Sequence, residues 1–256
     1  MMNIDINCDL GESFGHYTLG NDAEMMTLIS SANIACGFHA GDPSVMRQTI
    51  ALALQHGLGI GAHPGFNDLA GFGRRNMHME ADELRDALIY QLGALHAFVR
   101  LAGATLQHVK PHGAMYNMAA NDVTMARTIV NAVREFDARL IFFGLPGSKI
   151  ITLAQEAGLR VAREVFIDRA YNDDGSLVPR TTPGAVITDP DEVAARVVKM
   201  VSERKVTTIT GTELDLEFET ICVHGDTPGA LEHVKHIVQA LKQAGMQIVP
   251  AGAFLP

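Results

Sequence analysis

Polar side chains that can do chemistry recur at even spacing along several short apolar runs of the sequence. In the first run Asp5, Asn7 and Asp9 alternate with apolar residues, and side chains two positions apart on a strand face the same way. Similar residues lie toward the C-terminal ends of the other runs or just beyond a run: Glu12, Asn33, His39, His63, His108, Lys110, His112, Glu164, Asp168, His224 and Asp226. Barrels and open α/β sheets build their active sites at these strand ends, so we expect one shared mouth.

The residue types at this mouth indicate hydrolytic chemistry. Carboxylates beside histidines and a lysine supply a general acid, a general base and electrostatic stabilisation, which hydrolysis of an amide or lactam carbonyl requires. A single histidine is more often a hydrogen-bonded core or rim residue. Here, however, four histidines occupy equivalent strand ends: His39, His63, His112 and His224. The histidines expected at the surface, on helices or in a loop, are His56, His78, His96, His233 and His236.

Water is the expected nucleophile. The sequence has no GxSxG elbow, the turn that presents a catalytic serine in many hydrolases. Cys8, Cys36 and Cys222 lack CxxC spacing and an obvious base, although Cys222 shares its strand face with His224. The same pattern predicts neither a disulfide framework nor a structural zinc site. Two interpretations of Asp5 are equally supported: a role in the site, or a buried ion pair within the barrel.

Two loop motifs are candidate anion sites. Residues 72–75 read FGRR, and these arginines either bind a carboxylate or phosphate or remain solvated. Residues 144–149 read GLPGSK, which lacks the spacing of a nucleotide-binding loop and instead predicts a helix N-terminus. Tyr116 and Asn117 either orient a ligand or pack a loop.

The elements that must position these residues alternate between strands and helices. Apolar runs predict seven strands, at residues 4–9, 32–38, 58–63, 106–111, 140–145, 161–168 and 220–226. Helix starts are predicted at Asp42–Pro43, Asp189–Pro190 and Thr227–Pro228, and helix ends at Gly57, Gly103, Gly158 and Gly245. This alternation predicts a parallel α/β sheet, either open or closed. About seven units without a linker favour a single TIM-barrel-like (β/α) barrel over residues 1–256, with a functional loop at 168–189.

Composition excludes several classes of protein. The 256 residues include 20 Lys and Arg against 29 Asp and Glu, a net charge of −9, which argues against a nucleic-acid partner. No run reaches the roughly 18 apolar residues of a membrane span, so we expect no membrane association. The chain starts with MMNIDINCDL, without the basic residues of a signal peptide. We therefore expect a cytoplasmic protein.

The motifs together resemble the LamB/YcsF family. The stretches that carry the resemblance are DINCDLGE, SANIACGFHAGD, GIGAHPGF, FGRR, HVKPHGAMYN, EVFIDRAY, GSLVPR and CVHGDTPGA. The stretches follow one another in the family's order, and the similarity spans residues 2 to about 250. One departure is the stretch SFGHYTLGND, which is longer than in shorter family members.

The resemblance implies a fold and a reaction. Bacterial family members form the A subunit of ATP-dependent 5-oxoprolinase, and their barrel is related to that of polysaccharide deacetylases. With subunits B and C they open the lactam 5-oxo-L-proline to L-glutamate while ATP becomes ADP and phosphate. The positions that match family motifs are Asp5, Asn7, Asp9, Glu12, His39, Asp42, His63, Arg74, Lys110, His112, Glu164, Asp168, Arg169, Arg180, His224 and Asp226.

These matches lead to a hypothesis about residue roles. Partner subunits would activate the lactam oxygen, with Arg74 or Lys110 holding anionic oxygen, Asp9 or His63 activating water, and His112 or His224 acting as the acid. The expected catalytic residues are Asp9, His39, His63, Lys110, His112 and His224. The expected substrate-binding residues are Asn7, Glu12, Arg74, Glu164, Asp168, Arg169, Arg180 and Asp226.

Two rival functions remain open from the sequence. In the first, Asp9, His39 and His63 bind Zn²⁺ and the chain is a metal-dependent deacetylase or amidohydrolase acting alone. In the second, the chain is a noncatalytic subunit that only binds the lactam for its partners. The sequence does not decide whether a divalent metal is present.

Overall fold

The computed structural model describes residues 2–179, 181–225 and 230–255. Seven parallel strands form its centre: β1 Met2–Leu10, β2 Ser31–Ala35, β3 Gly59–His63, β4 His108–Val109, β5 Ile141–Gly144, β6 Arg160–Phe166 and β9 Thr220–Val223. They pair in this order, and β9 pairs with β1 to close the ring. The predicted barrel is therefore confirmed.

Five of the seven barrel strands end earlier than the apolar runs predicted, whereas β1 ends one residue later and β3 ends at the predicted residue. The fourth run, for example, contributes only His108 and Val109 to the ladder, and the polar residues that follow extend beyond it. Their backbone still follows the neighbouring strand, because Lys110 N–H donates to the Ala62 carbonyl at 2.9 Å and His112 N–H to that of Pro64 at 2.8 Å. The functional residues therefore project from the ends of the strands into the mouth.

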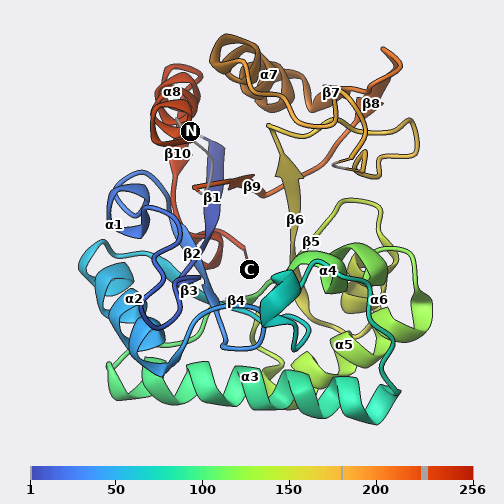
Figure 1. The fold of residues 1–256 in the computed structure, drawn as a ribbon. Coiled ribbons are helices and arrows are strands. Elements are labelled where there is room, and N and C mark those ends of the chain that lie inside the picture. The colour runs from blue at the N-terminus through green and yellow to red at the C-terminus, as the bar shows by residue number, and fades with distance from the viewer. Residues whose placement is uncertain (1, 180, 226–229, 256) are drawn as a thin grey trace.

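Helices cover the outside of the barrel (Figure 1). They are α1 Asp22–Met25, α2 Pro43–Gln55, α3 Ala81–Leu101, α4 Gly113–Ala119, α5 Val123–Asp137, α6 Lys149–Glu156, α7 Pro190–Glu203 and α8 Ala230–Gln243, with short 3₁₀ turns at Leu69–Gly71 and Ala251–Ala253. None of the helices in the described part of the chain combines the length and apolarity that a membrane crossing needs.

The predicted helix boundaries have the expected local chemistry. The Asp42 carboxylate accepts hydrogen bonds from the Ser44 and Val45 amides, with Pro43 as the first residue of α2. At α7 the Glu192 amide donates to Asp189. The predicted helix-end glycines have positive φ angles, as this position requires: Gly57, Gly103, Gly158 and Gly245. The predicted start at Thr227–Pro228 lies outside the described residues.

Three strands were not predicted. β7 Lys205–Thr207 and β8 Glu213–Asp215 form an antiparallel hairpin, and β10 Met246–Ile248 pairs with residues 2–4 of β1. The hairpin and α7 lie at the opposite end of the molecule from α3 (Figure 1).

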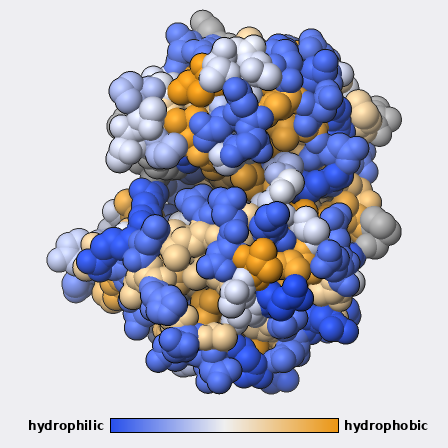
Figure 2. All heavy atoms as spheres, turned by 90° about the vertical axis from the view of Figure 1, so that its right-hand side faces the viewer, coloured by the Kyte–Doolittle hydropathy of each residue, from blue (hydrophilic) through white to orange (hydrophobic). Residues whose placement is uncertain are grey.

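The face in Figure 2 is mostly hydrophilic, and a hollow separates its upper from its lower half.

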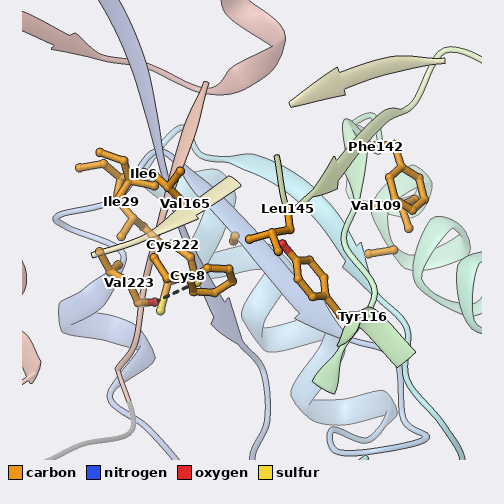
Figure 3. Packing of buried hydrophobic residues seen from close by; sticks show 14 of the residues in the cluster. Ile6, Cys8, Ile29, Val109, Tyr116, Phe142, Leu145, Val165, Cys222 and Val223 are labelled. Atoms are coloured by element: carbon orange, nitrogen blue, oxygen red, sulfur yellow. Dashed lines mark hydrogen bonds between the residues drawn. The ribbon is translucent and has the colours of Figure 1, made fainter. Parts of the chain in front are cut away.

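The apolar core lies between the barrel and its helices. Along β1 the side chains of Ile4, Ile6, Cys8 and Leu10 face this layer and are buried. Figure 3 shows part of it, including Val109 of β4 and its register partner Phe142 of β5. The barrel interior is largely polar instead, and its buried residues include Asp5, Asn7, Ser31, Asn33, His108, Lys110, Glu164 and Thr220. A small apolar cluster of Ile141, Phe143, Ala162 and Ala251 packs separately from the main core.

Candidate functional site

A buried lysine lies at the centre of the mouth. The Lys110 ammonium is 2.9 Å from Asp9 Oδ1 and 2.8 Å from Glu164 Oε1, and it also donates to Asn7 Oδ1 and to Cys222 Sγ, each at 3.2 Å. Burial opposes its charge, but the charges of Asp9 and Glu164 outweigh burial and raise the pKa of Lys110. Lys110 is therefore a permanent cation facing two carboxylates.

Asp9 is the carboxylate of this group that solvent reaches. Its side chain is 22% exposed, whereas that of Glu164 is fully buried. Asp9 Oδ2 lies 3.2 Å from His63 Nε2, and Oδ1 accepts a hydrogen bond from the Asn33 amide at 2.8 Å. Burial opposes ionisation of Asp9, but the charges of His63 and Lys110 outweigh it and hold the pKa well below its usual range.

Three buried histidines and a glutamate lie beside Asp9. His63 Nε2 is 2.9 Å from His112 Nδ1, and the rings of His39 and His112 stack with centroids 3.7 Å apart. Burial is the main cause that lowers the pKa of His39 far below its ordinary value and that of His112 to about 3. Glu12 Oε1 is 3.5 Å from His39 Nε2 and 3.8 Å from His112 Nδ1.

A second histidine–carboxylate pair lies at the rim. His224 follows β9 and Asp168 follows β6, and His224 Nδ1 is 2.6 Å from Asp168 Oδ2. The ring of Phe166 joins this pair to the centre, since it stacks with His224 at 6.1 Å and lies 5.7 Å from Lys110 Nζ. The site thus contains two acid–base groups around one cation.

Asp5 lies deeper in the barrel and contacts hydroxyl groups. Its carboxylate accepts hydrogen bonds from Ser30, Ser31 and Thr220 at 2.7, 2.6 and 2.5 Å. The ionic tie considered from the sequence is therefore wrong, because the side chains that bond to Asp5 are uncharged. Burial raises its pKa to about 6, although the three hydroxyls act in the opposite direction.

Two predicted arginines make contacts other than those around Lys110, and one of them, Arg74, adds positive charge beside His39 and His112. Arg169 is buried and donates to the carbonyls of Val178 and Ala185, so it contributes to the fold of the 168–189 loop. Arg74 is exposed, with its guanidinium 4.9 Å from the Phe72 ring. Two further candidates, Arg180 and Asp226, lie outside the described residues.

The remaining loop motifs have local structural roles. Arg75 of the FGRR motif forms an ion pair with Asp68, whereas Arg74 does not take part in that pair. The GLPGSK motif precedes α6, as its sequence predicted. The long stretch after Glu12 forms a turn in which Phe14 bridges Tyr17 and the Gly15 amide donates to Asp42.

Some residues that shape the site were not among the site residues predicted from the sequence. Ser31 and Thr220 bind Asp5, Cys222 contacts Lys110, and the Phe72 carbonyl lies 2.8 Å from His112 Nε2. Even spacing could have identified the first three, since Ser31 precedes Asn33 by two residues and Thr220, Cys222 and His224 are two apart. A backbone carbonyl leaves no sequence signal.

Of the five histidines expected at the surface, four are exposed and one is half-buried. His56, His78, His96 and His236 are exposed, and His233 is half-buried on α8. His108, on β4, is buried in the barrel interior with its Nε2 2.8 Å from Asn33 Oδ1.

Known proteins resemble this chain along nearly its full length. The LamB/YcsF family profile matches residues 4–255. A protein of Pyrococcus furiosus named as the A subunit of 5-oxoprolinase is 51% identical over 254 residues, which cover 99% of this chain and 100% of the relative. One of the same name from Clostridium beijerinckii is 53% identical over 250 residues, 98% of each chain.

Solved structures agree with the sequence comparison. A lactam utilization protein from Thermus thermophilus is 46% identical, with a TM-score of 0.93 over 97% of this chain and 99% of that one. A peptidoglycan N-acetylglucosamine deacetylase is 12% identical, with a TM-score of 0.50 over 99% and 87% of the two chains, and it shares the fold alone. From the match of its sequence and its barrel, this chain belongs to the LamB/YcsF family.

Proposed function

We propose that this chain is the A subunit of an ATP-dependent 5-oxoprolinase. It would act with subunits B and C to open 5-oxo-L-proline to L-glutamate while ATP is converted to ADP and phosphate. Relatives that carry the 5-oxoprolinase name are more than 50% identical over almost all of both chains. The observation that carries the proposal is the mouth itself, where a reachable carboxylate and a His–Asp pair flank a buried cation.

The coupling to ATP follows from the chemistry of the substrate. A lactam is a resonance-stabilised amide, and transfer of a phosphoryl group from ATP to its oxygen makes the ring carbon a good electrophile. Water then adds to that carbon and the ring C–N bond breaks, with a proton going to the nitrogen. The resulting acyl phosphate reacts with a second water to give L-glutamate and phosphate. We assign ATP and the phosphoryl transfer to the partner subunits and the hydrolytic steps to this chain.

The geometry of the mouth narrows the choice of base and acid. We assign the water-activating role to Asp9, because its carboxylate is partly exposed and Lys110 and Asn33 orient it. We assign proton donation to His224, whose ring Asp168 orients. His112 is less suited to this step because both of its ring nitrogens contact other protein groups.

The cations divide between two roles in this proposal. Lys110 is buried against Asp9 and Glu164, so we assign it to stabilise the Asp9 carboxylate rather than to bind substrate. Arg74 is exposed beside Phe72, and we assign its guanidinium to the ring carboxylate or the phosphate of the substrate. A ligand without an anionic group would lose this contact, which favours 5-oxoproline over a simple lactam.

The test is ATP-dependent release of glutamate from 5-oxoproline by the reconstituted complex. Release should require the chain together with its B and C subunits. His224→Gln should lower the rate about 100-fold through loss of a general acid. His236→Gln, at an exposed position of α8, is the matched control and should leave the rate unchanged.

Two outcomes would contradict the proposal. Glutamate release at the full rate without this chain would remove it from the reaction. A rate that needs the chain but is unaffected by His224→Gln and by Asp9→Asn would identify a noncatalytic lactam-binding subunit instead.

A further inference from the structure

The three histidines and the glutamate of the mouth form a cluster whose chemistry goes beyond acid–base catalysis. We propose that Glu12, His39, His63 and His112 bind one divalent transition-metal ion, with Zn²⁺ the favoured ion. Each residue offers one ligand atom, and these atoms lie within 4.8 Å of one another. The site lies within the mouth used in the proposed function, but binding of the ion by the isolated chain does not depend on which reaction occurs there.

Backbone carbonyls fix the hydrogens on two of the rings. His63 Nδ1 is 2.8 Å from the Lys110 carbonyl and His112 Nε2 is 2.8 Å from the Phe72 carbonyl. A carbonyl oxygen only accepts, so each of these nitrogens carries the hydrogen. Histidines that bind metals are oriented in this way, with the second ring nitrogen donating to a carbonyl or carboxylate.

When both rings are neutral, their opposite nitrogens therefore face each other with lone pairs. His63 Nε2 and His112 Nδ1 are 2.9 Å apart, and Asp9 Oδ2 is 3.2 Å from His63 Nε2. Such an arrangement needs a cation between the acceptors. A proton on one ring would bridge one pair of acceptors, whereas Glu12 and His39 bring further acceptors to the same place.

His39 supplies an independent observation. Its ring is almost completely buried, at 1% exposure, and neither ring nitrogen has a hydrogen bond with any residue that the structure describes. A buried polar group without a partner costs about 1–3 kcal/mol. Nε2 of this ring points to Glu12 at 3.5 Å, and a bound ion would satisfy it.

The distances fit an ion after a small movement. Ligands at about 2.1 Å from a metal lie about 3.0 to 4.2 Å from one another. Three of the pairs are 2.9, 3.5 and 3.8 Å apart, close to this range, and all four ligand atoms lie within 4.8 Å of one another. The stacked ring of His39 has to tilt away from His112 for both to point at one ion. No hydrogen bond to a described residue opposes this tilt, whereas the Phe72 carbonyl holds His112 in place.

Two glycines shape the space around these rings. A Cβ atom at Gly65 would lie 2.7 Å from His39 Nδ1, and one at Gly73 would lie 2.8 Å from both His39 Cβ and His112 Cδ2. Gly73 also has a φ of +62°, which favours glycine. The backbone therefore approaches the histidines as closely as it can.

The donor set indicates the class of metal. Three imidazoles and one carboxylate suit Zn²⁺ and its neighbours in the first transition row, whereas Mg²⁺ and Ca²⁺ prefer oxygen ligands. This set differs from the combination of Asp9, His39 and His63 expected from the sequence, because the four ligand atoms that converge belong to Glu12, His39, His63 and His112. An ion here would supply Lewis acidity next to the proposed base.

The experiment measures metal binding without substrate, ATP or partner subunits. The purified chain is stripped with a chelator and titrated with Zn²⁺ by calorimetry and with Co²⁺ by visible absorption. We expect one equivalent of either ion per chain and the d–d bands of Co²⁺ bound to nitrogen ligands. Glu12→Gln and His39→Ala should each weaken binding about 100-fold or more, since even loss of an outer-shell partner costs 10- to 100-fold.

The control is a histidine–carboxylate pair at the surface. His78 lies 3.6 Å from Glu80, but both side chains are exposed, so His78→Ala should leave binding unchanged. Circular dichroism confirms that each variant is folded. The proposal is overturned if the folded chain takes up no stoichiometric Zn²⁺ or Co²⁺, or if neither Glu12→Gln nor His39→Ala weakens the uptake.

This result is separate from that of the glutamate assay. Metal uptake by a chain that does not support glutamate release would retain the ion site and reject the proposed reaction. Glutamate release supported by a chain that takes up no metal would retain the proposed reaction and reject the ion site.

Discussion

Asp5 and Asp9 lie four residues apart on the same face of the same strand, yet their surroundings differ completely. Asp5 is fully buried and accepts hydrogen bonds from three hydroxyl groups. Asp9 is partly exposed and faces Lys110 and His63. Burial raises the pKa of Asp5 to about 6, whereas at Asp9 nearby cations outweigh burial and hold the pKa well below its usual range.

The difference shows that the groups facing a carboxylate decide what it does, and that these groups change along one strand. Hydroxyl groups satisfy hydrogen bonds without supplying charge, so the lower layer around Asp5 ties strands together. The upper layer around Asp9 contains compensating charges and contact with solvent, which a reacting group needs. One residue type on one strand face therefore serves the fold at one end and chemistry at the other.

The strongest test of this comparison exchanges each aspartate for asparagine. Asp9→Asn should lower glutamate release by the reconstituted complex about 100- to 10,000-fold, because a general base is lost without a change of shape. Asp5→Asn should leave kcat within about twofold, since the Asp5 carboxylate is completely buried below the mouth. Equal losses of kcat in the two folded variants would show that the comparison is wrong.

A smaller effect is expected when the cation of the upper layer is removed. Lys110→Met should lower the free energy of unfolding by about 3 to 5 kcal/mol, because it leaves two carboxylates facing each other without their buried partner. Adding Glu164→Gln should recover part of the loss, which urea unfolding of the single and double variants measures. Lys235→Met, which breaks an exposed pair with Glu232, is the control. A double variant no more stable than Lys110→Met would contradict this account.

The smallest effect concerns the pH dependence that Asp5 contributes. Its folded pKa of about 6 exceeds the ordinary value of 3.8, so folding favours the protonated form. The contribution is complete below about pH 4 and is lost as pH rises through 6, by about 3 kcal/mol in total. Relative to Asp5→Asn, the wild-type free energy of unfolding should fall over this range. Asp86→Asn, at an exposed position of α3, should show no such relative change. A difference between wild type and Asp5→Asn that does not vary with pH would reject the prediction.

Much of the fold was predictable because the signals are local. All seven barrel strands lie within predicted apolar runs or overlap them closely, and the caps at Asp42 and the helix-end glycines follow from single residues. The β7–β8 hairpin and β10 were missed because their strands are three residues long and lack a clear period. The way β10 lies against the start of β1 depends on tertiary pairing.

The site was predictable as a set of residues rather than as a set of contacts. Even spacing placed Asp9, Lys110 and Glu164 at one mouth, and the structure brings Lys110 within 2.9 Å of both carboxylates. The same spacing gave no reason to separate Asp5 from Asp9, because depth along the barrel depends on the stagger of strands that are distant in sequence. The roles of individual residues stay predictions.

Lys110 couples the two halves of the mouth, which are the acid–base group around Asp9 and the histidine cluster. Its side chain holds Asp9 while its main-chain carbonyl orients His63, so one peptide unit is shared by the acid–base group and the histidine cluster. A ligand that shifts this unit at one half changes the geometry of the other. By linkage, occupants of the two halves should then alter each other's affinity to the same degree, which makes them thermodynamically coupled ligands of one small network.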